Sequence, residues 1–199
     1  MVKRLVKRGA RAVATILVFP AACLAFFGRF HGGFIFFAQA LALVPGVLGS
    51  YLRVAFYSLT LERCEQDSHI AVGSYFSHAQ ASVGARVGIG AYCVLGQVDL
   101  GDGTLLASGV QILSGASQHI RDAQGQLTDE GRVFLRLRVG SDCWIGANAI
   151  IMANLGTQVT VAAGSVVSRD VPPGATVAGN PSRLVRPPMG AKEQRIASP

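Results

Sequence analysis

An aliphatic residue followed by a small one recurs at a fixed interval through the C-terminal two thirds of the chain. The interval is six residues, apart from one five-residue and one four-residue step. Helices and simple alternating strands do not produce this interval, whereas a coil of short strands joined by tight turns does. The pairs are Val83-Gly84, Ile89-Gly90, Leu95-Gly96, Leu100-Gly101, Leu106-Ala107, Val139-Gly140, Ile145-Gly146, Leu155-Gly156 and Val161-Ala162, and Ile112, Ile151 and Val167 hold the same phase.

The fold class predicted from this repeat is all-β. Six residues make one flat strand and one turn, with the aliphatic residue pointing to the axis and the small residue letting the backbone fold at the corner. Three such units close one triangular turn of a solenoid. These twelve units, with additions at Ile70, Phe76 and Val177, predict about five turns.

The repeat is interrupted between Ile112 and Val139. Residues 114–138 form a polar segment that contains His119 and several acidic side chains. A long loop inside a regular coil is usually functional. We therefore expect the catalytic loop of the protein at residues 114–138.

Three stretches downstream of this loop carry a family resemblance. They are VGSDCWIG at 139–146, AGSVVSRDVP at 163–172 and AGNPSRLVR at 178–186. In this order and after this repeat, they resemble the galactoside, maltose and xenobiotic acetyltransferase branch of the hexapeptide-repeat acyltransferases. The resemblance implies that residues 62–186 form a left-handed parallel β-helix. The Pro187-Pro188 pair and the small polar residues after it predict a flexible tail at residues 187–199.

The resemblance also implies a site. His119, in GASQH at 115–119, matches the general base that acts on the acceptor hydroxyl or amine. Acetyl-CoA would be the acyl donor, with no tightly bound cofactor, and the cleft would lie between subunits of a homotrimer. The implied donor contacts are Trp144 as a wall, Gly146 and Ala147 through backbone groups, Ala163 and Ser168 at the pantetheine arm, and Arg169, Arg183 and Arg186 at the nucleotide phosphates.

Plainer roles remain open for some of these residues. Arg183 and Arg186 could be solvated residues that close the solenoid, and Trp144 could cap the core. His119 could hold the loop through a hydrogen bond to a nearby acid. His78 is a second residue that could touch the acceptor, or an ordinary surface histidine.

The first 61 residues differ in composition from the rest. They hold seven Lys or Arg and no Asp or Glu, so the net charge of +7 lies in this segment. Uncharged runs at residues 12–28 and 30–52 are separated by Arg29. As helices, residues 12–27 would be about 24 Å long and residues 34–52 about 28 Å, both short of the roughly 30 Å hydrocarbon core.

The basic, apolar segment predicts membrane association. The turn at residues 28–33 favours either a tight transmembrane hairpin or a re-entrant or interfacial helix pair kinked at Pro45. The basic residues before the first run place the start of the chain, and the catalytic domain, on the cytoplasmic side. Arg53, Tyr57 and Arg63 would be interfacial anchors. A cleaved signal peptide is the rival interpretation, because PAAC at residues 20–23 loosely imitates an export site.

Other function classes fit less well. The basic excess favours anionic lipid over nucleic acid, because the neutral remainder has no basic face beside stacking aromatics. The four cysteines are widely spaced and predict neither a zinc site nor a disulfide framework. A γ-type carbonic anhydrase would need a histidine cluster, and His69, His78 and His119 do not supply one around His119. A membrane-tethered β-helix scaffold is the non-enzymatic alternative.

The function predicted from the sequence is therefore that of a membrane-attached acyltransferase. It would move an acetyl or other acyl group from a CoA thioester to a sugar hydroxyl or amine in cell-envelope or exopolysaccharide assembly. The sugar rests on the family resemblance and on the membrane segment, since lipid-linked saccharides are presented at bilayer surfaces.

Overall fold

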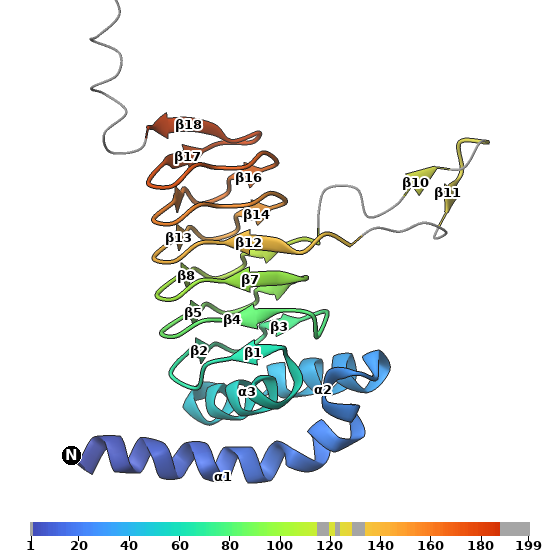
Figure 1. Ribbon diagram of the computed structural model, residues 1–199, viewed down its shortest axis with the longest axis vertical. Helices are drawn as coiled ribbons and strands as arrows, with labels where there is room; N and C mark the ends of the chain where they lie inside the picture. The colour runs from blue at the N-terminus through green and yellow to red at the C-terminus, as the bar shows by residue number, and fades with distance from the viewer. Residues whose placement is uncertain (1, 115–119, 122–123, 129–133, 188–199) are drawn as a thin grey trace, which may run out of the picture.

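The computed structural model describes residues 2–114, 120–121, 124–128 and 134–187. A parallel β-solenoid of stacked triangular coils stands on a group of helices, which we call the head (Figure 1). The head comprises α1 (Val2–Leu24), η1 (Phe26–Gly28), α2 (His31–Ala42) and α3 (Gly46–Thr60). About five turns of solenoid follow, as the repeat predicts.

Three sheets form the faces of the solenoid, and we call them A, B and C. Sheet A has the order β1-β4-β7-β12, sheet B the order β18-β17-β15-β13-β8-β5-β2, and sheet C the order β16-β14-β9-β6-β3. All neighbours within these sheets are parallel except β17 and β18. The strands are β1 (Arg63–Cys64), β2 (His69–Ile70), β3 (Tyr75–Phe76), β4 (Ser82–Val83), β5 (Gly88–Ile89), β6 (Val94–Leu95), β7 (Val98–Leu100), β8 (Leu105–Leu106), β9 (Gln111–Ile112), β12 (Leu137–Val139), β13 (Trp144–Ile145), β14 (Ile150–Ile151), β15 (Thr160–Val161), β16 (Val166–Val167), β17 (Thr176–Ala178) and β18 (Arg183–Arg186).

The aliphatic residues of the repeat form the core of the solenoid. All twelve are buried, and equivalent residues stack in register, as Ile89 does on Leu106 and Ile151 on Val167. Each coil adds three such side chains to a continuous apolar column that excludes water. The prediction that the aliphatic residue of each unit points to the axis is confirmed.

The small residue of each unit is needed for a different reason from the one expected. None of the repeat glycines has a positive φ. Instead, the coils stack so closely at the corners that a Cβ on Gly90 would lie 2.6 Å from the carbonyl carbon of Ala107, and one on Gly146 would lie 2.4 Å from the nitrogen of Ala163. Close approach of one coil to the next therefore excludes larger side chains at these positions.

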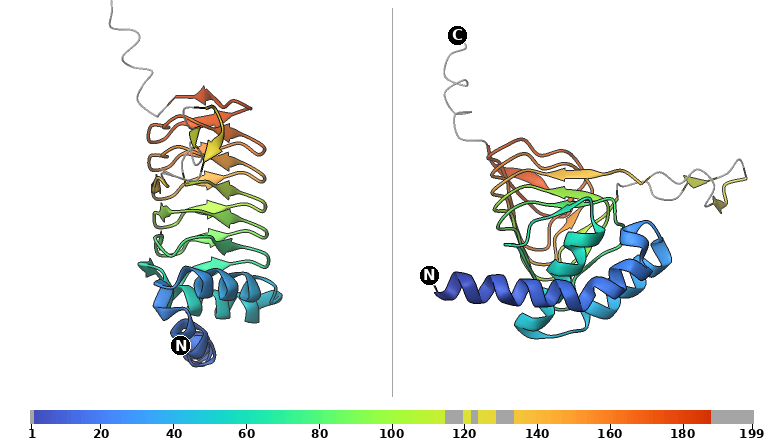
Figure 2. Two further views of the ribbon diagram at one scale, coloured as in Figure 1. Left: turned by 90° about the vertical axis from the view of Figure 1, so that its right-hand side faces the viewer. Right: turned by 60° about the horizontal axis from the view of Figure 1, so that its bottom comes forward.

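The helix α1 lies across the base of the molecule, beneath α2 and α3 (Figure 2). Its residues Ala14, Val18 and Ala22 recur every four positions and are buried, because this stripe faces the other helices. Residues 34–52 do not form one helix kinked at Pro45, because α2 ends at Ala42 and α3 begins at Gly46. In the described part of the chain, no helix combines the length and the apolar character that crossing a bilayer requires.

Polar residues of α3 bind the open edge of the first coil. The Ser50 hydroxyl accepts the N–H of Ile70 at 3.3 Å, the Arg53 Nε donates to the carbonyl of Ile70 at 3.1 Å, and the Tyr57 hydroxyl accepts the N–H of Phe76 at 3.1 Å. Their spacing of three and four residues places all three on one face of α3. This face of α3 therefore satisfies backbone groups that β2 and β3 would otherwise leave without a partner.

The prediction that Arg53 and Tyr57 are interfacial anchors is wrong, since both side chains are fully buried. Arg53 also donates to the carbonyl of Leu41, in the last turn of α2, and to that of Val44, just after the helix, both at 2.8 Å. Burial lowers the pKa of the Arg53 guanidinium. Burial also raises the pKa of the Tyr57 hydroxyl, and the smaller effect of the Arg53 charge opposes that rise. Arg63 is exposed and pairs with Glu65 at 3.0 Å.

Candidate functional site

The predicted catalytic loop leaves the solenoid at the corner between sheets C and A, which we call the C–A corner. It follows β9 and returns through Phe134 to β12, and its described part includes a hairpin of β10 (Ile120–Arg121) and β11 (Leu127–Thr128). Figure 1 shows this hairpin standing away from the coils. His119, the predicted general base, lies outside the described residues, so its role stays a prediction.

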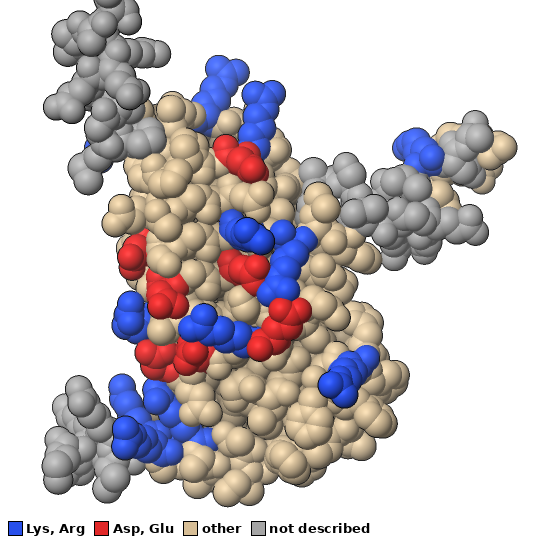
Figure 3. Space-filling view, viewed as in Figure 1, with Lys and Arg blue, Asp and Glu red and all other residues tan. Residues whose placement is uncertain are grey.

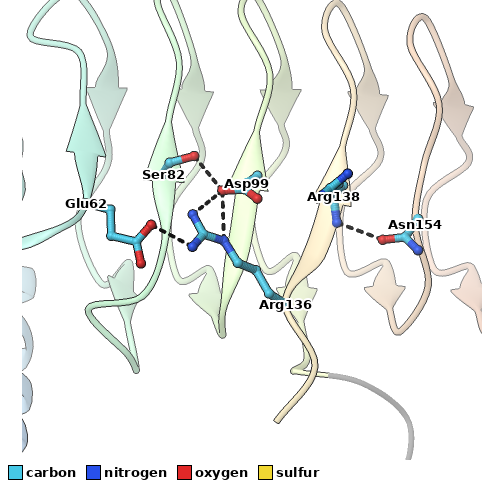
Figure 4. Close-up of polar contacts among 6 residues, drawn as sticks. All are labelled: Glu62, Ser82, Asp99, Arg136, Arg138 and Asn154. Carbon is cyan, nitrogen blue, oxygen red and sulfur yellow. Dashed lines mark hydrogen bonds and ion pairs between the residues drawn. The ribbon is translucent and has the colours of Figure 1, made fainter.

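Arg136 fixes the point at which the loop returns (Figure 4). Its guanidinium binds the Asp99 carboxylate on β7 and, at 2.6 Å, the Glu62 carboxylate next to the head. The Ser82 hydroxyl donates to the same Asp99 oxygen at 2.6 Å. Burial alone would raise the pKa of Asp99, but the hydrogen bonds from Arg136 and Ser82 outweigh it and hold that pKa below its usual value. The end of the loop is thus tied to both the solenoid and the start of the first coil.

Two histidines meet near the same corner. The His78 ring, which follows β3, lies 5.5 Å from the ring of His31 at the start of α2 and 4.9 Å from that of Phe134. The Ser77 hydroxyl donates to the carbonyl of Leu95 and lies 2.9 Å from His78 Nδ1. Because its own hydrogen points to Leu95, this hydroxyl is assigned as the acceptor of a hydrogen bond from the Nδ1–H of His78, and Nε2 is then the basic nitrogen of the neutral ring.

Burial, and after it the neighbouring His31, lowers the pKa of His78. The neutral imidazole is therefore the favoured form at neutral pH. The sequence singled out His78, whereas His31 lies within the predicted turn at residues 28–33. It gave no indication that they touch, because they lie 47 positions apart and are joined only by the packing of α2 on the first coil.

Gly146, Ala147 and Ala163 come together at the corner between sheets B and C, which we call the B–C corner. Gly146 lies directly against the backbone of Ala163 in the next coil. In the lower coils, side chains one coil above cap corner N–H groups: at the B–C corner Ser108 binds the N–H of Ala91 at 3.3 Å, and at the corner between sheets A and B Asp102 binds that of Ala85 at 2.9 Å.

At the B–C corner this capping stops in the upper coils, although beside sheet A it continues, where Asn154 caps the N–H of Arg138 at 2.9 Å and Asp170 caps that of Asn154 at 2.8 Å. Ala163 stands two residues after its core valine, as Ser108 stands two residues after Leu106, and so occupies the capping position above Ala147. Its methyl group cannot accept a hydrogen bond, and Gly179, in the same position above Ala163, has no side chain. Within the described residues, the N–H groups of Ala147 and Ala163 at the B–C corner therefore have no side-chain cap from the coil above.

The other implied donor contacts lie on different faces of the chain. Trp144 is 58% exposed and points outward from sheet B, which does not fit the alternative that it caps the core. Arg183 and Arg186 are exposed on β18, at the edge of sheet B. Ser168 and Arg169 follow β16 and lie at the C–A corner. One chain does not bring all these residues together, and a cleft that used both corners would need two chains.

Two depressions lie where the head meets the solenoid. One, of about 500 Å³, is mainly apolar and is lined by Phe36, Ala40, Leu43, Gly73, Tyr75 and Tyr92 among others. The other, of about 200 Å³, is polar and is lined by Lys7, Arg11, Asp67 and His69 among others. Neither is lined by an implied donor contact. Within the described ranges, no group of three or more His, Cys, Asp or Glu side chains is placed to hold a metal ion.

The chain matches a family model described as the hexapeptide repeat of succinyl-transferase, at residues 80–114 and 136–169. It is 30% identical to galactoside O-acetyltransferase of Escherichia coli K12 over 93 residues, which are 45% of this chain and 43% of that protein. It is 38% identical to nodulation protein L of Rhizobium meliloti over 108 residues, 52% of this chain and 57% of that protein. The chain thus spans about half the length of these relatives.

Solved structures share the fold. The hexapeptide-repeat acetyltransferase VCA0836 of Vibrio cholerae aligns with a TM-score of 0.62 and 22% identity, over 78% of this chain and 91% of that one. A maltose O-acetyltransferase of Clostridium difficile 630 aligns with a TM-score of 0.55 and 18% identity, over 80% and 89%. VCA0836 has also been crystallised with acetyl coenzyme A.

Proposed function

We propose that this hexapeptide-repeat protein is a CoA-dependent acyltransferase that moves an acetyl or other acyl group to a hydroxyl or amine of a sugar. The observation that carries the proposal is the row of uncapped N–H groups at Ala147 and Ala163, in the part of the chain that is similar to acetyltransferases. An extended, amide-bearing pantetheine arm offers carbonyls that such N–H groups can bind.

The other proposed contacts with the acyl donor are made by exposed side chains. Trp144 offers an exposed aromatic wall close to the B–C corner. Arg183 and Arg186, exposed on β18, can bind nucleotide phosphates through their guanidinium groups. Ser168 and Arg169, at the C–A corner, would belong to a donor site only across a boundary between chains. We therefore propose a homotrimer in which neighbouring chains complete each site.

His119 is the proposed general base. Its neutral imidazole takes the proton of the acceptor hydroxyl or amine as that atom attacks the thioester carbonyl carbon. The tetrahedral intermediate then collapses with cleavage of the carbon–sulfur bond, and the CoA thiolate leaves with the proton returned by His119. Acyl group and proton are thereby transferred without an external oxidant or metal.

The proposed setting is a membrane surface facing the cytoplasm, in cell-envelope or exopolysaccharide assembly. Two features support it: the basic, acid-free first 61 residues, and the similarity of the solenoid to sugar-related acetyltransferases such as galactoside O-acetyltransferase. An enzyme held at the bilayer would meet a lipid-linked saccharide at high local concentration.

The test follows a labelled acetyl group from acetyl-CoA into detergent-solubilised membrane lipids and identifies by mass which species gains it. His119→Ala should lower turnover by roughly 10² to 10⁴ while CoA binding and assembly persist. His78→Ala is the matched control, because it removes the described histidine near the loop. If His119→Ala turns over normally and His78→Ala does not, the base is His78. If the chain binds no CoA thioester, the scaffold alternative replaces the enzyme.

A further inference from the structure

The outward face of α1 is apolar although it packs against no other part of the described chain. From residue 12 onward, its buried stripe faces the other helices, and its opposite side carries Val13, Ile16 and Leu17 at 57%, 71% and 62% exposure. Thr15 is the one polar residue in this half of the helix, and its hydroxyl is bound to the carbonyl of Arg11. A helix whose second face met only water would carry charged or polar residues there.

The same character continues through the rest of the head. Of the large apolar side chains that are exposed in the described residues, twelve lie between Val13 and Leu48. Scattered exposed apolar residues are ordinary, but a concentration of this kind marks an interaction surface. We call it the head surface, and its members are Val13, Ile16, Leu17, Phe19, Leu24, Phe26, Phe27, Phe30, Phe36, Leu43, Val47 and Leu48.

The charge around the head surface has one sign. Lys7 and Arg8 are exposed on the first half of α1, and the head contains no acidic residue. In Figure 3 the acidic residues lie over the coils, while the basal region shows only basic and uncharged side chains. A second copy seated head to head would bring like charges together, which opposes association. The partner that complements both features is apolar and negatively charged.

We infer that the head surface docks on one leaflet of an anionic phospholipid bilayer, with α1 lying in the plane of the interface. The apolar side chains of α1 and of the turns beside it enter the boundary between headgroups and acyl chains. Lys7 and Arg8 bind lipid phosphates. The bilayer is thus the membrane partner of the proposed function. The docking does not depend on acyl transfer, and only the role of the docked protein rests on the proposed function.

In this orientation the C–A corner of the first coil, next to the head, lies toward the lipid. His31 follows Phe30 of the head surface directly and touches His78 beside the returning loop at Phe134. A saccharide attached to a membrane lipid would thus reach the C–A corner from the head side, while the B–C corner of the upper coils stays open to a soluble CoA donor.

Vesicle flotation tests the inference with the full chain. The protein should float with vesicles of phosphatidylcholine and phosphatidylglycerol, and much less with phosphatidylcholine alone. Ile16→Asp/Leu17→Asp should lower the partition coefficient at least roughly 30-fold, because two apolar anchors are lost and two charges are repelled by the lipid. Leu184→Asp/Val185→Asp is the matched control, since this pair is equally apolar, 54% and 66% exposed, and lies at the far end of the solenoid.

A native label reports the same contact. Cys23 on α1 is exposed, whereas Cys64, Cys93 and Cys143 are buried. Burial, with a smaller effect of Glu65, raises the pKa of the Cys64 thiol to about 12, which further protects it from thiol reagents. An environment-sensitive fluorophore on Cys23 should shift its emission to shorter wavelength when anionic vesicles are added. The same label on Leu184→Cys, in a Cys23→Ser background, should not.

Several results would overturn the inference. The wild-type chain could stay with the soluble fraction in the presence of anionic vesicles, or the Ile16/Leu17 variant could float as well as its control. A lipid-free, head-to-head assembly abolished by the same variant would show that a second copy covers the surface instead. Acetyl transfer to a soluble sugar without flotation would overturn the docking alone, and flotation without any CoA binding would overturn the proposed enzyme alone.

Discussion

Replacing Arg53 by methionine should destabilise the junction between the head and the solenoid. The side chain is fully buried and donates to the carbonyls of Ile70, Leu41 and Val44 at 3.1, 2.8 and 2.8 Å. Three hydrogen bonds at a net ~1 kcal/mol each amount to about 3 kcal/mol. Relief of the buried cation, whose Nη2 finds no partner among the described residues, opposes this loss. The net loss is therefore at most about 3 kcal/mol, which for a chain of this size lowers Tm by at most roughly 6 to 12 °C.

Two spectroscopic signals can locate this destabilisation. Far-UV circular dichroism follows the helices of the head, and the fluorescence of Trp144, the single tryptophan, follows the upper coils. In a solenoid each coil contacts only its neighbours, so the helical signal should melt earlier in Arg53→Met while the Trp144 transition moves less. Arg63→Met is the control, because that exposed ion pair is worth less than about 1 kcal/mol. Parent-like melting of Arg53→Met would refute the reasoning.

Three further predictions concern the corners. The pKa of His78 is lowered in the folded chain, so the unfolded chain binds the proton more readily and stability should fall as the pH drops below about 6.5; His78→Gln should remove this dependence in thermal melts. Asp99→Asn weakens the hold of Arg136 and should speed proteolytic cleavage in the loop segment, with overall stability lowered by no more than about 1 kcal/mol. Ala163→Ser places a hydroxyl where it can cap the N–H of Ala147, and should weaken CoA binding several-fold by calorimetry.

The solenoid could be predicted from the sequence because each repeat unit is defined by about six consecutive residues. The six-residue interval is already visible in the short stretch from Val83 through Ile89 to Leu95, so the repeat can be recognised without knowing how the coils stack. The reason for the small residues could not be found in the same way. It depends on how closely Gly146 approaches Ala163, and that distance exists only once the coils are stacked.

The head shows where hydropathy fails as a guide. An apolar helix that packs on protein and one that packs on lipid have the same composition, so composition alone predicts Arg53 and Tyr57 to be membrane anchors. Their spacing with Ser50 was the available signal, since polar residues on one face of an apolar helix need partners. What the spacing lacked was the identity of those partners, which are backbone groups of Ile70 and Phe76 in the first coil.

The parts of the candidate site that depend on neighbouring sequence could be predicted, whereas those that depend on packing between distant segments could not. The row of Ala147 and Ala163 follows from aligning consecutive coils, yet a shortened coil shifts the alignment from 17 residues, between Leu106 and Ile89, to 16, between Val161 and Ile145. The contact of His31 with His78 depends on the packing of the head and carried no sequence signal. The role of His119 is predicted from its motif alone and stays a prediction, because this residue lies outside the described ranges.

The two faces of the head decide how its function must be probed. One face, through Ser50, Arg53 and Tyr57, completes the hydrogen bonds of the first coil, and the other leaves Ile16 and Leu17 bare. Truncation of the first 52 residues would remove the bare face together with Ser50 and would cut α3 immediately before Arg53, so a loss of activity could reflect an unpaired sheet edge as readily as a lost membrane contact. Substitutions confined to the bare face leave the edge bonded. For this fold, the membrane contact can be tested only from the outside of α1.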